Sequence, residues 1–350
     1  MYEKLENIGR EDLTAEELLG KLDALGVRAA LCAVLASLTN SILQEREIHM
    51  RSMRSRAGVV CTAMLVVAVA ALGLAGSASA KLTGEFTKFS QCPFSNLEVK
   101  KCLYSPTTGG EVVLGSKTVP IVNEAVLQGG FGKPDPETRF SKFFGASNGV
   151  TLSKAAQPVP GGLAGIVNCK AISNFIVRIA CEATFENGLT GLNSTLELAK
   201  PASEIKISEN HLAEEEGVAL KLPVRVHLEN PFLGSECFVG SSSSPIWWEL
   251  TTGTTSPPGP NKPITGYGGE LELREEGSVL LLNKAVLVDN AWAAPGVTGC
   301  GGFGVELILN PIINSAAGLP AAAGKNTAIL KNNINVAAGA AVRLNNEENP

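Results

Sequence analysis

Short runs of alternating apolar and polar residues dominate the chain after residue 80. The clearest covers 218–228, in which every second residue from Leu220 to Leu228 is apolar. Side chains of a β-strand point to alternate faces, so this pattern predicts a strand with one buried face. Gly and Pro separate further runs of this kind, which is typical of many short strands. Strands are expected at 111–114, 118–122, 166–169, 175–185, 194–198, 218–228, 246–250, 270–273, 279–282, 304–309 and 327–336.

These runs predict an all-β protein. The alternation of strands and helices that a parallel sheet requires is absent, and the best helical candidate is a turn or two at 311–317. We therefore expect an antiparallel β-sandwich or partly closed barrel, stapled by disulfides. It would form one domain or two subdomains, β-rich region 1 at 81–200 and β-rich region 2 at 201–350. Two stretches rich in glycine and proline, 129–162 and 251–263, are expected to be long surface loops.

Residues 50–80 have the features of a signal peptide. Three arginines precede a charge-free apolar stretch at 57–76, and Ala78 and Ala80 provide the small side chains that signal peptidase accepts. We expect cleavage after Ala80. The alternative is an uncleaved transmembrane anchor, because about 20 apolar residues also span a bilayer. No second apolar segment of that length follows, so we expect no membrane span after cleavage and a location that is secreted or associated with the cell envelope.

Residues 1–49 form an upstream extension that signal peptides do not ordinarily carry. Thr14 and Glu17 have capping-box spacing, and apolar residues recur at helical intervals after them, so a cytoplasmic amphipathic segment is one explanation. The other, which we favour, is a misassigned start, with translation beginning at Met50 or Met53.

Six cysteines follow residue 80. An even number in an exported protein predicts disulfides, here three. Six cysteines allow many pairings, and we expect the sequential one because the first two pairs each enclose a segment no longer than a hairpin. The expected pairs are Cys92 with Cys102, Cys169 with Cys181, and Cys237 with Cys300. These cysteines lack the close pairwise spacing of zinc ligands, which disfavours a zinc site.

Charge and composition narrow the function further. The formal net charge is −5, and no basic run is interleaved with aromatic residues, so nucleic acid is not an expected partner. Asp135 and Asp289 are the only aspartates after residue 80, which leaves few carboxylates for a hard cation. We expect no metal and no other cofactor. The run Glu214–Glu216 is expected to form a solvated turn.

Residues Gly145–Gly149 spell the G-x-S-x-G of a nucleophile elbow around Ser147. That motif requires a strand, a sharp turn and a helix, and the residues that follow offer no helix. The acid-then-histidine order is also missing, because Asp289 lies after both His211 and His227. A serine hydrolase that uses Ser147 is a minor alternative, as is a glycosidase whose glutamate pair is assembled only by the fold.

A second glycine motif, G-x-G-x-x-G, is formed by Gly299, Gly301 and Gly304. A dinucleotide site needs this motif between a strand and a helix. Because 305–309 is strand-like, we expect instead a glycine turn anchored by a disulfide of Cys300.

Two adjacent tryptophans suggest a surface contact. Alternation places Trp248 with Ile246 and Leu250 on the core face and leaves Trp247 outward beside the proline-rich loop. An exposed indole is able to stack on a cell-wall glycan or contact an envelope protein. The alternative is that Trp247 covers a sheet edge or packs under the loop.

Four blocks, Cys92–Cys102, Gly109–Pro120, Asn230–Pro263 and Val288–Gly301, resemble a group of uncharacterised exported proteins of high-GC Gram-positive bacteria of the Solirubrobacter type. The resemblance covers most of the chain after residue 80. It implies secretion and paired cysteines, and it brings no activity, ligand or catalytic residue. The tryptophan pair departs from the smaller residues that are more usual at that place.

Taken together, the sequence predicts an exported, non-enzymatic structural or binding protein of the cell envelope or extracellular space. The alternatives are a secreted hydrolase of the esterase or glycosidase type and a carrier that holds an apolar ligand between sheets.

Overall fold

The computed structural model describes residues 81–162, 178, 191–302 and 304–349. Residues Ala80–Pro350 form one compact unit. Its strands are β1 (Lys101–Leu114), β2 (Lys117–Pro120), β3 (Ala125–Pro134), β4 (Ser141–Gly145), β5 (Ala156–Pro158), β6 (Asn193–Leu198), β7 (Lys206–Ile207), β8 (Leu220–Glu229), β9 (Phe238–Val239), β10 (Ile246–Leu250), β11 (Glu270–Arg274), β12 (Val279–Asp289), β13 (Val297–Thr298) and β14 (Thr327–Ala338). The α-helices are α7 (Glu209–Glu214), α8 (Glu306–Ala317) and α9 (Gly339–Glu348), and the 3-10 turns are η2 (Gly84–Phe89), η4 (Ala202–Glu204) and η5 (Glu275–Gly277).

The described strands form one open antiparallel sheet. Its order is β11-β12-β14-β1-β3-β4-β7-β8-β6-β5, with β2 paired to β1, β9 and β10 to β8, and β13 to β9. The ladders between these strands run antiparallel. This confirms the expected all-β antiparallel fold.

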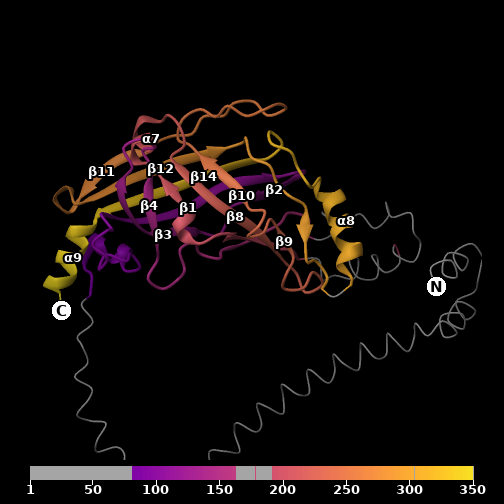
Figure 1. The fold of residues 1–350 in the computed structure, drawn as a ribbon, viewed down its shortest axis with the longest axis horizontal. Coiled ribbons are helices and arrows are strands. Elements are labelled where there is room, and N and C mark those ends of the chain that lie inside the picture. The colour runs from indigo at the N-terminus through magenta and orange to yellow at the C-terminus, as the bar shows by residue number, and fades with distance from the viewer. Residues whose placement is uncertain (1–80, 163–177, 179–190, 303, 350) are drawn as a thin grey trace, which may run out of the picture. The chain divides into compact units, whose positions relative to one another are not determined.

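Strands from the two ends of the unit lie side by side. β1 pairs with β14 along almost its whole length, and in Figure 1 the purple β1 runs beside the yellow β14. β6 likewise pairs with β8. The two β-rich regions expected on either side of residue 201 therefore contribute strands to the same sheet.

Two hydrophobic clusters hold the sheet. The larger contains Val224, Trp248 and Leu287 and receives side chains from most of the strands. The smaller contains Phe89 of η2 and Val342 of α9, and it also includes Cys102 near the start of β1. It therefore packs η2 and α9 against the beginning of that strand. Several polar strand residues are buried as well, among them Thr195, Glu197 and Asn332.

Two disulfides staple the described part of the unit. Cys92 bonds to Cys102 within the smaller cluster, and Cys237 bonds to Cys300 within the larger one. Both are pairs of the expected sequential arrangement. The third expected pair, Cys169 with Cys181, lies outside the described residues, as do the strands expected at 166–169 and 175–185. None of the helices in the described part of the chain has the length and apolar composition that a bilayer crossing requires.

The strand expected at 304–309 is wrong, because α8 occupies 306–317. A short apolar run does not by itself distinguish strand from helix. Ile313 and Ala317, one helical turn apart, are buried, and Gly318 ends the helix at φ 66°, a left-handed conformation that suits glycine. Helix α9 was not expected either.

The surface loop expected at 129–162 is also wrong. This stretch holds most of β3 and all of β4 and β5, and Phe131 and Phe143 within it are buried. The glycines are there for close packing: a Cβ on Gly130 would lie 2.6 Å from Val99 Cγ1, and one on Gly129 would lie 2.4 Å from the Phe144 carbonyl oxygen.

Candidate functional site

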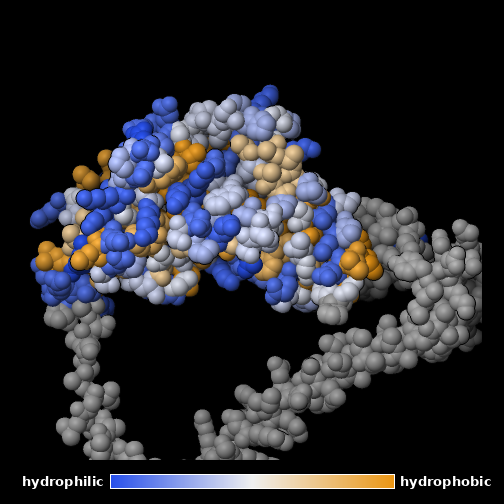
Figure 2. Space-filling view, viewed as in Figure 1, coloured by the Kyte–Doolittle hydropathy of each residue, from blue (hydrophilic) through white to orange (hydrophobic). Residues whose placement is uncertain are grey.

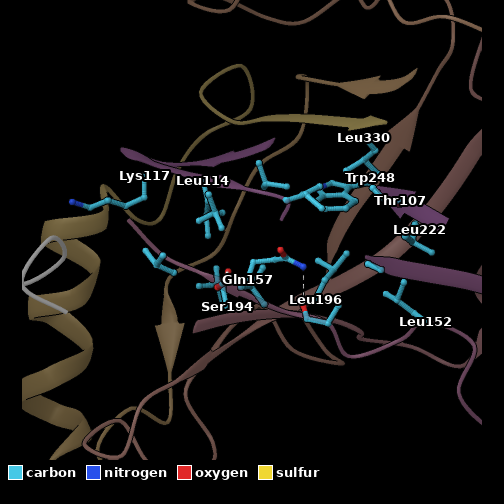
Figure 3. A pocket seen from close by; sticks show the side chains of 18 of the residues that line it. Thr107, Leu114, Lys117, Leu152, Gln157, Ser194, Leu196, Leu222, Trp248 and Leu330 are labelled. Atoms are coloured by element: carbon cyan, nitrogen blue, oxygen red, sulfur yellow. Dashed lines mark hydrogen bonds between the residues drawn. The ribbon is translucent and has the colours of Figure 1, made fainter. Parts of the chain in front are cut away.

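An apolar cavity lies inside the larger hydrophobic cluster. It has a volume of about 130 Å³. Its walls come from both halves of the unit, with side chains from β1 and β2, from β8 and β10, from β12 and β14, and from α8. Figure 3 shows these side chains converging on a common space between the strands.

The walls are apolar because they are the core-facing positions of alternating strands. β8 contributes Leu222 and Val226, and β10 contributes Trp248. Val112 and Leu114 of β1 also line the cavity, and Figure 3 shows Leu114 across the cavity from Leu222. The surface that a ligand would meet is therefore almost entirely hydrocarbon.

The residues that line the cavity are not all equally buried. Val112, Leu114 and Val119 of the β1–β2 hairpin are only half-buried, whereas Leu222 and Trp248 are buried. Leu152, Leu196 and Leu220 of the wall are half-buried too, so the hairpin is one of several parts of the wall that lie near solvent.

The polar side chains in the wall mostly bind the protein itself. Gln157 Oε1 accepts hydrogen bonds from the backbone N–H groups of Val122 (2.8 Å) and Asn123 (2.9 Å), and its Nε2 donates to the Asn123 carbonyl oxygen (2.7 Å). Thr107 Oγ1 donates to Asn332 Oδ1 at 2.6 Å. These hydrogen bonds join the segments around the cavity. They also occupy polar groups of the wall, so few remain available to a ligand.

Trp248 is the exception. Its side chain is 1% exposed, and its Nε1 has no hydrogen-bond partner. A buried donor left unpaired costs about 1–3 kcal/mol. Asp289 holds the neighbouring residue of β10 in place, because its Oδ2 accepts from Glu249 N at 2.7 Å. Burial raises the pKa of the Asp289 carboxyl, although hydrogen bonds from Ala291 and Glu249 oppose that shift.

The opposite face of β6 and β8 carries a charged cluster centred on Glu197. Arg225 Nη2 lies 2.7 Å from Glu197 Oε2, and Lys154 Nζ lies 2.7 Å from Oε1. Burial by itself raises the pKa of the Glu197 carboxyl, but the hydrogen bonds and charges of Lys154 and Arg225 outweigh it and hold that pKa below its usual value. The carboxyl is therefore ionised at neutral pH, and its main partners are already in place.

His227 lies at the edge of this cluster. Its Nδ1 is 3.4 Å from Glu229 Oε1 and 4.0 Å from Glu197 Oε1, and Phe238 stacks on the ring at a centroid distance of 4.4 Å. His227 Nε2 and the Thr195 hydroxyl are both buried without partners. Thr195 is paired with His227 across the β6–β8 ladder.

The hydrolase alternative gains no support from the placement of Ser147. This residue lies exposed in a turn after β4, and no helix follows that turn. His211 contacts the Val218 carbonyl oxygen through Nδ1 at 2.9 Å and lies edge-on to Phe140. Ser147, His211 and His227 thus have separate surroundings.

All three residues of the run Glu214–Glu216 are exposed, as expected, but only part of the run is a turn: Glu214 ends α7, and Glu215 follows it in a left-handed conformation. Glu214 pairs with Arg139, and Glu215 Oε1 accepts from Gly268 N at 2.7 Å. No group of three or more metal-ligating side chains occurs among the described residues.

The second glycine motif does precede a helix, α8, contrary to expectation. Its strand, however, is the two-residue antiparallel β13, and Cys300 within the motif is tied to Cys237. A Cβ on Gly299 would lie 2.1 Å from the Glu236 carbonyl oxygen, so this glycine permits the close approach of two chain segments. The motif is a stapled turn.

Trp247 is 38% exposed, whereas Ile246, Trp248 and Leu250 are buried, as alternation predicts. Its contact with a glycan or protein partner stays a prediction. Other apolar side chains reach the surface near β11, with Leu271 and Leu273, and on α8, with Leu307 and Ile308 (Figure 2). None of these lines the cavity.

This cavity was not predicted from the sequence. Alternation identified its wall residues as core, and no sequence signal indicated that the core would leave a space.

No family model, curated protein or solved structure matches this chain. The resemblance to exported actinobacterial proteins therefore stays a prediction.

Proposed function

We propose that this is an exported, non-enzymatic protein that binds a small apolar ligand in the cavity between β1, β8, β10 and α8. The observation that carries the proposal is the cavity. Protein interiors are close-packed, with few voids larger than a water molecule. A space of about 130 Å³ walled by leucine, valine and tryptophan is a departure from that rule.

Energetics support a bound ligand. An apolar cavity costs roughly 24 cal/mol of stability per Å³, so this one costs about 3 kcal/mol when empty. Water gains little there, because nearly all the wall is hydrocarbon. An apolar molecule would recover lost dispersion contacts and leave water at the same time.

The volume sets the size of the ligand. An engineered apolar cavity of about 150 Å³ takes up benzene, and the present one is slightly smaller. The buried part of the ligand should therefore be about one aromatic ring or a chain of about six carbons. A much larger lipid would need the hairpin side to open.

Export is part of the proposal. Disulfides persist mainly in oxidising compartments, and the two in the described part of the chain agree with that setting. The signal-peptide features of residues 50–80 add to it. The absence of a catalytic arrangement around Ser147 favours binding over hydrolysis.

The test uses protein produced from the full chain in a secreting host. Toluene and 1-hexanol are titrated, and their binding is followed by calorimetry and by the rise in thermal midpoint, since a ligand of the folded state raises stability by mass action. Val112→Phe, which adds bulk to the cavity wall, should weaken both probes at least tenfold. Native mass spectrometry of the secreted protein would show any ligand that it already carries.

Val113→Phe is the matched control. Val113 is the next residue of β1, is also half-buried and does not line the cavity. It should leave probe binding within about twofold. Absence of binding by the wild-type protein, or equal loss in the two variants, would refute the proposed function.

A further inference from the structure

The strand β11 forms an edge of the sheet. It stands at the end of the strand order, and among the described strands it pairs with β12 alone (Figure 1). An edge strand presents a row of backbone N–H and C=O groups that a strand of another chain is able to pair with. The sheet therefore has a place at β11 where one more strand can be added.

Apolar side chains reach this edge from the core. Residues directly opposite each other in an antiparallel ladder point to the same face, and one such row leads from β1 through β14 and β12 to β11: Leu103, Val336, Leu280 and Leu273. Along this row Leu103 and Val336 are buried, Leu280 is half-buried and Leu273 is 59% exposed. Leu271, on the same face of β11, is 63% exposed. The apolar face of the sheet thus continues to its edge.

The sequence of β11 is complementary to itself in the antiparallel direction. It reads Glu-Leu-Glu-Leu-Arg. In a register centred on Glu272, Leu271 of each copy lies opposite Leu273 of the other, and Glu270 lies opposite Arg274. A shift by one residue would place leucines opposite charged side chains, and a shift that centres the pairing on Leu271 would place Glu270 opposite Glu272. The centred register is thus the one that matches all five residues.

The charges of β11 already have partners in their own chain. Arg274 pairs with Glu272, and Lys284 Nζ lies 2.8 Å from Glu270 Oε1. All four side chains are well exposed, and such pairs contribute little stability. The charges therefore select the register by avoiding like-charge contacts at the ends of the strand. The attraction between copies comes from the leucines and from the backbone groups of the two edges.

We propose that two copies of this chain associate through β11, with the two strands antiparallel and centred on Glu272. Addition of a strand to an exposed edge supplies backbone hydrogen bonds, and the two-fold arrangement brings Leu271 and Leu273 of both copies together on one face. Their burial removes exposed hydrocarbon from water. The single like-charge contact is Glu272 with its counterpart, and each Glu272 keeps its own Arg274 as a partner. The dimer does not depend on the ligand of the cavity.

Sedimentation velocity of the protein produced from the full chain tests this dimer. The mean mass should rise toward twice that of the monomer as concentration increases from about 1 µM to about 500 µM, the range for a weak complex. Leu273→Lys should weaken association at least about tenfold, because it places a charge among the leucines. Leu307→Lys is the matched control: Leu307 is an exposed leucine of α8, and the change should leave association within about twofold.

A charge exchange tests the register. Glu270→Arg faces Arg274 of the other copy with a like charge, and Arg274→Glu does the same to Glu270, so each should weaken association about fivefold. The double variant with both changes restores opposite charges across the interface and should associate within about twofold of wild type. The thermal midpoint of every variant, measured at about 1 µM where the protein is monomeric, should match that of wild type, which shows that each one folds.

The proposal is overturned if the wild-type protein stays monomeric at the highest concentration. It is also overturned if Leu273→Lys and Leu307→Lys weaken association equally. A double variant that associates no better than the single variants overturns it as well, because the copies would then not meet in the register centred on Glu272.

Discussion

Strands β6 and β8 present two faces that differ in almost every physical respect. On one face Leu196, Leu222 and Val226 border the cavity. On the other, Glu197 and Arg225 form part of a compact charged cluster. Each strand supplies both faces through the same alternation of side chains.

The difference shows where a binding function can be accommodated. Glu197, Lys154 and Arg225 pair with one another, so the charges of that face are balanced by the protein alone. Among the described residues of that face, the buried groups without a partner are the neutral hydroxyl of Thr195 and the Nε2 atom of His227. The cavity face has apolar groups but too few of them to fill its interior. A void in hydrocarbon is relieved only by another apolar molecule, which is why we place the function on that face.

Removal of the Cys237–Cys300 disulfide should have the largest effect on stability and on ligand binding. The short strand β9, next to Cys237, contributes a side chain to each of the two faces. In β9, Phe238 stacks on His227 and Val239 lines the cavity. Loop-closure entropy for a sequence separation of 63 predicts a loss of about 4 kcal/mol in unfolding free energy for the double change to alanine. Urea unfolding measures it, and toluene binding should weaken as well.

The matching control is the double change of Cys92 and Cys102 to alanine. Their separation is 10, so the expected loss is smaller, about 3 kcal/mol. This pair lies in the smaller hydrophobic cluster, away from the cavity walls. If toluene binding fell equally in both double variants, the role given to β9 would be wrong.

Glu197→Gln should disturb the charged face alone. Breaking a fully buried pair costs about 3–5 kcal/mol, but Lys154 is largely exposed and Arg225 is one-third exposed, so we expect about 2 kcal/mol at pH 7. Toluene affinity should not change. Glu249→Gln, which affects an exposed pair with Lys221, should cost less than about 1 kcal/mol.

The Glu197 contribution should depend on pH in a defined direction. The pKa of Glu197 is lower in the folded protein than its usual value, so the ionised carboxyl stabilises the fold above the unfolded-state pKa near 4.3. That stabilisation is lost as pH falls through the folded-state pKa. Urea unfolding at pH 7 and pH 3 should therefore show the wild-type and Glu197→Gln proteins converging at the lower pH. A constant difference would contradict the assignment.

Alternation was a sound guide where a strand has one buried face. It located β8 and β10 and put Trp248 inside and Trp247 outside. It failed in the glycine-rich stretch 129–162, because glycine can mark either a flexible loop or a close contact between packed chains, and the sequence does not distinguish them. Gly129 and Gly130 belong to the second kind.

The cavity could not be predicted for a different reason. Its walls join residues far apart in the chain, such as Val112, Trp248 and Leu330. Each is an ordinary core residue by its pattern. The space depends on how closely β1, β8 and β14 approach one another, which is a property of the whole packing and not of any local sequence.

Trp247→Phe should have the smallest effect on stability. It removes the outward indole of β10 and keeps the inward one of Trp248, so it tests the two faces of that strand separately. Exposed positions away from special features change stability by less than about 0.5 kcal/mol. The chain has three tryptophans, and only Trp248 lines the cavity. The fluorescence change caused by toluene should therefore persist in Trp247→Phe and be largely lost in Trp248→Phe. The reverse result would place the probe on the outer face of β10, beside Trp247, and would move the binding site to the surface on which a glycan or protein partner was expected.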